Sequence, residues 1–173
     1  MPWVWGTMSG PGRDVAPAEL WLPPGGEERL SDFGSRLGWE DMWDTAFTLH
    51  EYRSEEPFHA AGLTVTPVQL VHYHLDTFGL RVSDGERTLA YSGDSGPSAR
   101  LVELARGADL FLCEATLERG EADGDPRGHL SAEEAVAAFE ASGARRLLVT
   151  HRPVELDLDA GLEQARDGLE LEL

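Results

Sequence analysis

The sequence predicts a layered fold of the α/β or α+β class. Two observations predict this class: residues 63–91 alternate between apolar and polar side chains, as strands do, and residues 95–150 alternate helix-like with strand-like segments. With 173 residues, of which 41% are hydrophobic and 27% charged, the chain has an ordinary globular composition. We therefore expect one domain over residues 1–173.

The first part of the chain carries few structural signals. In residues 1–17 the apolar side chains recur with neither the helix period nor the strand period, and we expect irregular structure there. A short strand is expected over 19–22, before two prolines. A helix is expected over 25–37, with Gly38 as its C-terminal stop, and a second short helix over 41–47.

The middle of the chain has the pattern of a β-meander. Strands are expected over 63–70, 78–82 and 88–91, because apolar residues recur there with the strand period. Asp84 and Gly85, between the second and third of these strands, are typical of a hairpin turn.

The second half favours alternating helices and buried strands. Pro97 suits the first turn of a helix, and Ser131 with Glu134 has the spacing of a capping box whose helix ends at Gly143. In chain order, the expected elements are a helix over 95–105, a strand over 108–113, a helix over 131–143, a strand over 145–150, a helix over 157–166 and an edge strand over 169–173.

The charge of the chain bears on its partners. A formal net charge of −18 repels polyanions, which argues against a grip on long nucleic acid. No stretch approaches the roughly 18–20 apolar residues that span a bilayer, and the N-terminus lacks the features of a signal peptide. Cys113 is the single cysteine, so no internal disulfide is expected. We therefore expect a cytoplasmic protein without a membrane partner.

Polar residues follow three of the expected strands. His72, Asp94 and His151 each come where an apolar run ends, and such positions often carry ligands in α/β sheets. Two imidazoles and a carboxylate suit Zn²⁺, Fe²⁺ or Mn²⁺. His74 is a rival to His72, which we favour because it directly follows the apolar run.

Four short motifs then occur in order: Tyr-Ser-Gly-Asp-Ser-Gly at 91–96, Cys-Glu-Ala-Thr at 113–116, Gly-His-Leu-Ser at 128–131 and Leu-Val-Thr-His at 148–151. Together they resemble the metallo-β-lactamase superfamily, and more narrowly its ribonuclease Z-like branch. Residues 71–82 resemble the strand of that branch in which a histidine precedes Phe/Tyr-Gly. The resemblance covers residues 19–155 and implies the second half of an αββα sandwich.

The resemblance also implies roles for five residues. Asp94 would bridge two metal ions, with His72 as a terminal ligand of one ion and His151 of the other. His129 would donate a proton, and the Glu114 carboxylate would orient it. The implied metal is Zn²⁺, with Mn²⁺ and Fe²⁺ as alternatives. Without the resemblance, each position has a simpler interpretation. The histidines would be surface residues, Asp94 would belong to a turn, and the Glu114 carboxylate would bond the backbone.

The sequence departs from the family in one respect. The family's His-x-His-x-Asp-His string, which supplies four metal ligands, is absent. His72, His74 and Asp76 reproduce its first part, but Thr77 stands in place of the final histidine. We therefore expect a domain that is incomplete at its N-terminus. It would keep three of seven ligand positions, enough for one metal ion.

These observations favour a metal-dependent hydrolase that cleaves a phosphodiester or other ester bond with a metal-activated water. The expected partner is a small substrate, and a homodimer is the expected assembly. A chain with three of the seven ligand positions would hold the second metal ion and its water poorly, so inactivity in this incomplete form is a further expectation. The alternatives are a non-catalytic remnant or binding module of the same fold, a ribonuclease Z-like RNA-processing nuclease, and a mononuclear enzyme with two histidines and one carboxylate.

Overall fold

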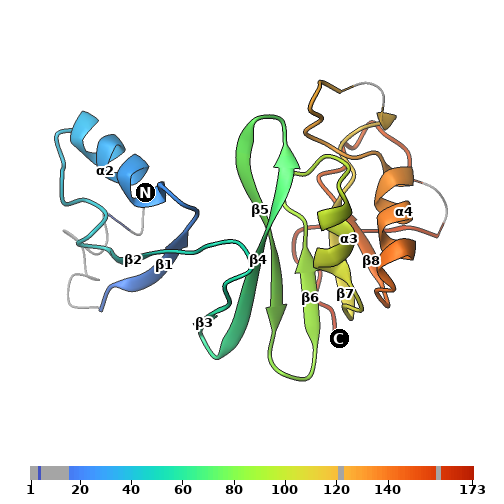
Figure 1. Ribbon diagram of the computed structural model, residues 1–173, viewed down its shortest axis with the longest axis horizontal. Helices are drawn as coiled ribbons and strands as arrows, with labels where there is room; N and C mark the ends of the chain where they lie inside the picture. Colours follow the sequence, from blue (N-terminus) through green and yellow to red (C-terminus); the bar gives the residue numbers. More distant parts are fainter. Residues whose placement is uncertain (1–3, 5–15, 121–122, 159–160) are drawn as a thin grey trace. The chain divides into compact units, whose positions relative to one another are not determined.

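The computed structural model describes residue 4 and residues 16–120, 123–158 and 161–173 (Figure 1). The chain divides into two compact units, residues 1–53 and 54–173, and each is described by itself. The expected irregular segment over residues 1–17 lies almost entirely outside the described residues. The expectation of a single domain stays a prediction.

In residues 16–53, the first unit contains strand β1 (Ala18–Leu22), helix α2 (Gly26–Arg36) and strand β2 (Phe47–Glu51). β1 and α2 confirm the strand and the longer helix expected from the sequence. β1 and β2 pair in parallel. The helix expected over 41–47 is wrong. Thr45 bonds the Asp41 carbonyl through both its N–H and its hydroxyl, and the chain then leaves this turn so that Phe47 can pair with Ala18.

The second unit is built on a seven-stranded sheet, in which the strands lie in chain order. Neighbours from β3 to β6 are antiparallel, and neighbours from β6 to β9 are parallel. The strands are β3 (Phe58–Ala60), β4 (Leu63–His72), β5 (Leu75–Ser83), β6 (Thr88–Tyr91), β7 (Leu110–Glu114), β8 (Leu147–Thr150) and β9 (Glu163–Gln164). The meander and both buried strands are thus confirmed.

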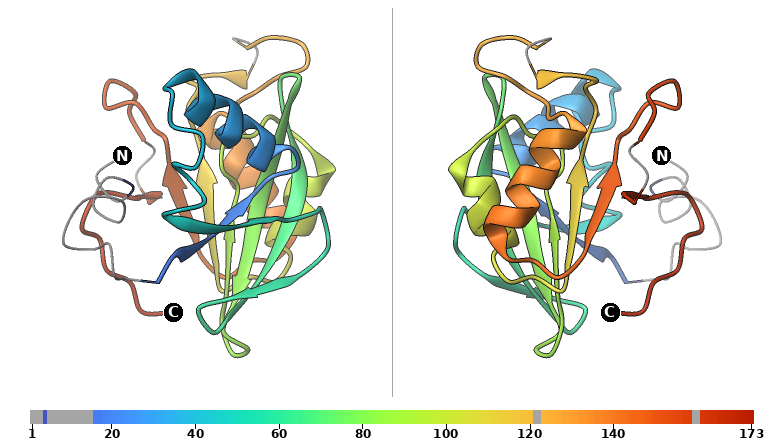
Figure 2. Two further views of the ribbon diagram at one scale, coloured as in Figure 1. Left: turned by 90° about the vertical axis from the view of Figure 1, so that its left-hand side faces the viewer. Right: turned by 90° about the vertical axis from the view of Figure 1, so that its right-hand side faces the viewer.

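Two helices, α3 (Ala99–Ala105) and α4 (Ala132–Ser142), lie side by side on one face of this sheet (Figures 1 and 2). The capping box of Ser131 and the stop at Gly143 are confirmed for α4. The helix expected from residue 95 instead begins at Ala99, after Ser98 as its N-cap. The backbone N–H of Gly96 is already bonded to the Val71 carbonyl, which holds residues 95–97 outside the helix.

The last part of the chain differs from the expectation. In place of a helix over 157–166, the described residues form turns and the short edge strand β9. The free edge of β8 explains this difference, because Ala165 N–H bonds the Val149 carbonyl there. Residues 169–173 do not form the expected edge strand, since β9 already occupies that edge.

The core of the second unit lies between the sheet and its two helices. Its fully buried members include Leu101 and Leu104 of α3, Phe111 and Cys113 of β7, and Val149 of β8. Burial raises the pKa of the Cys113 thiol, as expected for a core cysteine. Among the described residues, no helix has the length and apolar character needed to cross a membrane.

Strand direction places the polar residues. β4 runs antiparallel to β5 and β5 antiparallel to β6, so β4 has the same direction as β6 and its parallel neighbours β7 and β8. The carboxyl ends of these four strands therefore meet at one edge of the sheet. In parallel arrangements that edge is where ligands usually bind.

Candidate functional site

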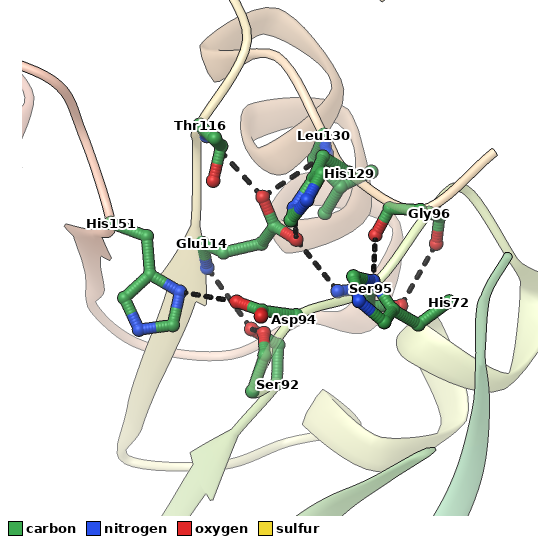
Figure 3. A network of polar contacts seen from close by, with 12 residues as sticks. His72, Ser92, Asp94, Ser95, Gly96, Glu114, Thr116, His129, Leu130 and His151 are labelled. Carbon is green, nitrogen blue, oxygen red and sulfur yellow. Dashed lines mark hydrogen bonds and ion pairs between the residues drawn. The ribbon is translucent and has the colours of Figure 1, made fainter. Parts of the chain in front are cut away.

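Four residues from the sequence prediction stand at this edge. His72 ends β4, Asp94 follows β6, Glu114 ends β7, and His151 comes directly after β8. His129 joins them from the segment before α4. Figure 3 shows these side chains in one polar network.

Glu114 is the buried centre of the network, with no exposed surface. Its Oε1 accepts a hydrogen bond from the backbone N–H of Ser95 at 2.6 Å. Its Oε2 accepts from the N–H groups of Leu130 at 3.2 Å and Thr116 at 3.3 Å. A buried charge is costly unless it is hydrogen-bonded, so these donors are what allow a carboxylate in this position.

His129 provides a further hydrogen bond to this carboxylate. Its Nδ1 lies 3.0 Å from Glu114 Oε1, and because an ionised carboxylate only accepts, Nδ1 carries the hydrogen. The Nε2 atom of His129 is therefore the one left for other chemistry. The sequence predicted that Glu114 orients His129, and the two side chains are in direct contact as that role requires.

His72 has a similar arrangement. Its Nδ1 lies 2.8 Å from the carbonyl oxygen of Gly128, which can only accept, so Nδ1–H donates and Nε2 is the nitrogen left available. A metal-ligating histidine usually has such an acceptor on its other nitrogen. His74, the rival position, lies exposed in the turn between β4 and β5.

Asp94 and His151 form the open part of the network. His151 Nδ1 lies 2.8 Å from Asp94 Oδ1, and both side chains are more than a third exposed. His151 has a left-handed φ of 55°, which is uncommon for a residue other than glycine. Such backbone outliers occur more often at functional sites than elsewhere.

The five residues thus belong to one cluster. The rings of His72 and His129 are 4.9 Å apart, and ligand atoms of Asp94, Glu114 and His129 lie within 4.8 Å of one another. That second group is a weak metal site, because both Glu114 oxygens already accept hydrogen bonds. Among the described residues, His72, Asp94 and His151 do not form such a group, although His72 Nε2 and the Asp94 carboxylate remain available as donors. Their role as ligands stays a prediction.

Two residues of this region were missed by sequence reasoning. The Tyr73 hydroxyl donates to Asp123 Oδ1 at 2.7 Å, and Asp123 Oδ2 accepts from the N–H groups of Gly128 at 2.7 Å and His129 at 2.8 Å. Desolvation acts to raise the pKa of Asp123, but these bonds lower it well below its usual range. The bond to Asp123 raises the pKa of the Tyr73 hydroxyl. The spacing from 73 to 123 gives no local signal for this contact.

The segment before α4 is also fixed by an ion pair. Arg127 donates to both oxygens of Glu134, at 2.6 and 2.8 Å, and to the His129 carbonyl at 3.1 Å. The hydrogen bond from Arg127 lowers the pKa of Glu134. Glu134 is also the capping-box residue of α4, so the pair connects this helix to the site.

Comparison with known proteins gives several matches. Residues 10–152 match the model of a family described as the beta-lactamase superfamily domain. An uncharacterized protein of Mycobacterium tuberculosis is 40% identical over 145 residues, which are 83% of this chain and 52% of that protein. A probable metallo-hydrolase of Bacillus subtilis is 27% identical over 74% of this chain and 53% of its own length.

Two further matches are a ribonuclease Z and a diphosphatase. A ribonuclease Z of Ignicoccus hospitalis is 43% identical over 86 residues, which are 48% of this chain and 29% of that protein. The crystal structure of a diphosphatase from the PhnP family has a TM-score of 0.71 at 23% identity, over 99% of this chain and 63% of that one. The chain spans about half the length of the first curated relatives it matches.

The Arg127–Glu134 pair predicts a pH effect on stability. The pKa of Glu134 is lower in the folded chain than in the unfolded chain. Its carboxylate therefore contributes fully to the free energy of unfolding above the ordinary glutamate pKa of about 4.3, and this contribution is lost as the pH falls through the pKa of the folded chain. We expect urea unfolding to show the parent chain more stable than Glu134→Gln at pH 7, with a smaller difference at pH 3. An equal difference at both pH values would contradict this linkage.

The buried carboxylate predicts a loss of stability on amide substitution. In Glu114→Gln, an NH₂ group replaces an acceptor that faces N–H donors, so the free energy of unfolding should fall by about 1–3 kcal/mol. Glu103→Gln is the matched control, since Glu103 is exposed and pairs only at the surface with Arg100. Urea unfolding measures both variants, and equal small losses would contradict the account of Glu114.

Proposed function

Because the chain belongs to the beta-lactamase superfamily domain family, we propose that its cluster is a metal-dependent hydrolytic site that acts on a phosphodiester or other ester bond of a small substrate. The family is one of metallo-hydrolases, and it includes the ribonuclease Z-like branch that the motifs resemble. The activity of this chain is part of the proposal, since its named relatives are matched over about half their length.

The placement of His72, Asp94 and His151 at one edge of the sheet carries this proposal. The three side chains come from three strand ends, and they offer two imidazole nitrogens and a carboxylate, which is a donor set suited to a divalent transition metal. The hydrogen bond from His72 Nδ1 to Gly128 supports ligation by Nε2. Zn²⁺ is the proposed metal, with Mn²⁺ or Fe²⁺ as alternatives.

The donor set supports one ion for each chain. The family's His-x-His-x-Asp-His string does not occur in these 173 residues, which therefore do not include the ligands that it would supply. Three protein ligands with an open position are typical of a catalytic zinc site. His151 and Asp94 now bond each other, and ligation of one ion by both would replace that hydrogen bond.

The chain's own residues then supply the proton chemistry. A bound cation contributes Lewis acidity at the scissile bond. His129 is held by Glu114 through Nδ1, so the imidazolium form of the ring would give its Nε2 proton to the leaving oxygen and become neutral imidazole. Full burial of Glu114 keeps this pair in one geometry, because the carboxylate has no alternative partner in water.

The net charge favours a small substrate over a long RNA. At −18, the chain repels a polyanion unless basic groups elsewhere compensate. The diphosphatase with a similar fold also agrees with a small phosphate ester as substrate. The similarity to a ribonuclease Z keeps RNA cleavage as the second candidate. Strong salt dependence on an RNA substrate, with no cleavage of a small diester, would favour that candidate.

The metal site predicts a specific pattern of affinities. Calorimetric titration of the metal-free chain with Zn²⁺ should give one ion per chain. His72→Ala and Asp94→Ala should weaken binding by on the order of 100-fold or more, because each removes a ligand. His74→Ala is the matched control, two residues from His72, and should retain affinity within about twofold. Equal losses in His72→Ala and His74→Ala would overturn the assignment of His72.

The same protein then tests hydrolysis. With Zn²⁺ bound, bis(p-nitrophenyl) phosphate should be cleaved at a rate that changes little with salt, and Asp94→Ala should abolish cleavage. Zinc binding without hydrolysis would instead favour a non-catalytic module. Failure to bind Zn²⁺, Mn²⁺ and Fe²⁺ would overturn the proposed site.

A further inference from the structure

The turn between β4 and β5 has a residue other than glycine in a backbone conformation that favours glycine. Tyr73 and His74 form this two-residue turn, because His72 pairs with Leu75 across the hairpin. Tyr73 has a left-handed φ of 51°, whereas His74 does not have positive φ. Positive φ at the first turn position alone is the type II′ pattern, which favours glycine there. A tyrosine at this position indicates that its side chain has a use that glycine cannot provide.

The Tyr73 ring packs closely against the segment before α4. A Cβ atom at Gly128 would lie only 2.2–2.6 Å from atoms of this ring, so glycine is required opposite the tyrosine. The ring centroid is 4.9 Å from that of His72 and 5.7 Å from that of His129. Tyr73 therefore contacts two of the three histidines of the site, His72 and His129, without offering them a hydrogen-bonding group.

Asp123 connects this tyrosine to the backbone that carries His129. One carboxylate oxygen accepts from the Tyr73 hydroxyl at 2.7 Å, and the other accepts from the N–H groups of Gly128 and His129 at 2.7 and 2.8 Å. Tyr73 N–H also donates to the Arg127 carbonyl at 3.3 Å. Hydrogen bonds that involve an ionised carboxylate are the stronger ones, so this connection is a firm link between two distant parts of the chain.

We propose that Tyr73 and Asp123 form a clamp that positions His129 against Glu114 and the Gly128 carbonyl against His72. The clamp acts on both histidines through the backbone of residues 128 and 129, so Tyr73 and Asp123 are positioning residues. Its value for catalysis rests on the proposed function. Its geometry does not, because every contact of the clamp joins two residues of the chain.

The clamp makes a prediction that concerns the two histidines and not overall stability alone. In Tyr73→Phe the ring and the turn are kept and only the hydroxyl is lost. The amide hydrogens of Gly128 and His129 should then exchange about tenfold faster or more, since the carboxylate that binds them loses its anchor. The imidazole ¹⁵N resonances of His72 and His129 should shift, whereas those of His59 should not.

The partner substitution tests whether the two residues act as one unit. Asp123→Asn should reproduce the changes of Tyr73→Phe, and the double variant should add little to Asp123→Asn alone, because both remove one shared interaction. Tyr52→Phe is the matched control and should leave the Gly128 and His129 signals unchanged. All spectra are recorded on the metal-free chain, with the unfolding midpoint measured for each variant.

The outcomes separate the clamp from the proposed function. Unchanged amide exchange and imidazole resonances in Tyr73→Phe would overturn the clamp, as would fully additive effects in the double variant. If the spectra change as expected, a Zn²⁺ titration should also show weaker binding in Tyr73→Phe. A parent chain that binds no metal would end the proposed function, while the spectra of the metal-free protein would still decide the clamp.

Discussion

The arrangement of the site depends on one buried charge. Glu114 ends a core strand with no exposure to water, so its carboxylate must find donors within the protein. It finds them in Ser95 after β6, in Thr116 after β7, and in the Leu130 and His129 positions before α4. Three segments that are far apart in the sequence therefore have to meet at one point. The position of His129 follows from this requirement, and Asp94 is held next to Ser95 on the same segment.

Sequence reasoning succeeded where a local pattern determines the structure. The capping box of Ser131, the glycine stop at Gly143 and the apolar runs of β7 and β8 all act within a few residues, and all were predicted. The sequence placed His72, Asp94, Glu114 and His151 at strand ends and His129 just before the capped helix α4, where the structure has them.

Sequence reasoning failed where contacts between residues far apart in the sequence determine the structure. Residues 157–166 have a helix-like composition, but β9 forms there because β8 offers a free edge. The Ser95–Pro97 segment resembles a helix start, but Glu114 and Val71 bind its backbone first. Tyr73 and Asp123 are fifty residues apart and carry no motif, so only the folded chain shows that they meet.

We propose that one metal ion is held by His72, Asp94 and His151, with His129 and Glu114 outside its coordination. X-ray absorption fine structure of the Zn²⁺-loaded chain tests this directly, because it counts imidazole ligands. We expect two imidazole ligands together with oxygen ligands, and the same number of imidazole ligands in His129→Ala. A single imidazole that disappears in His129→Ala would instead place the ion at Asp94, Glu114 and His129, and would contradict the account.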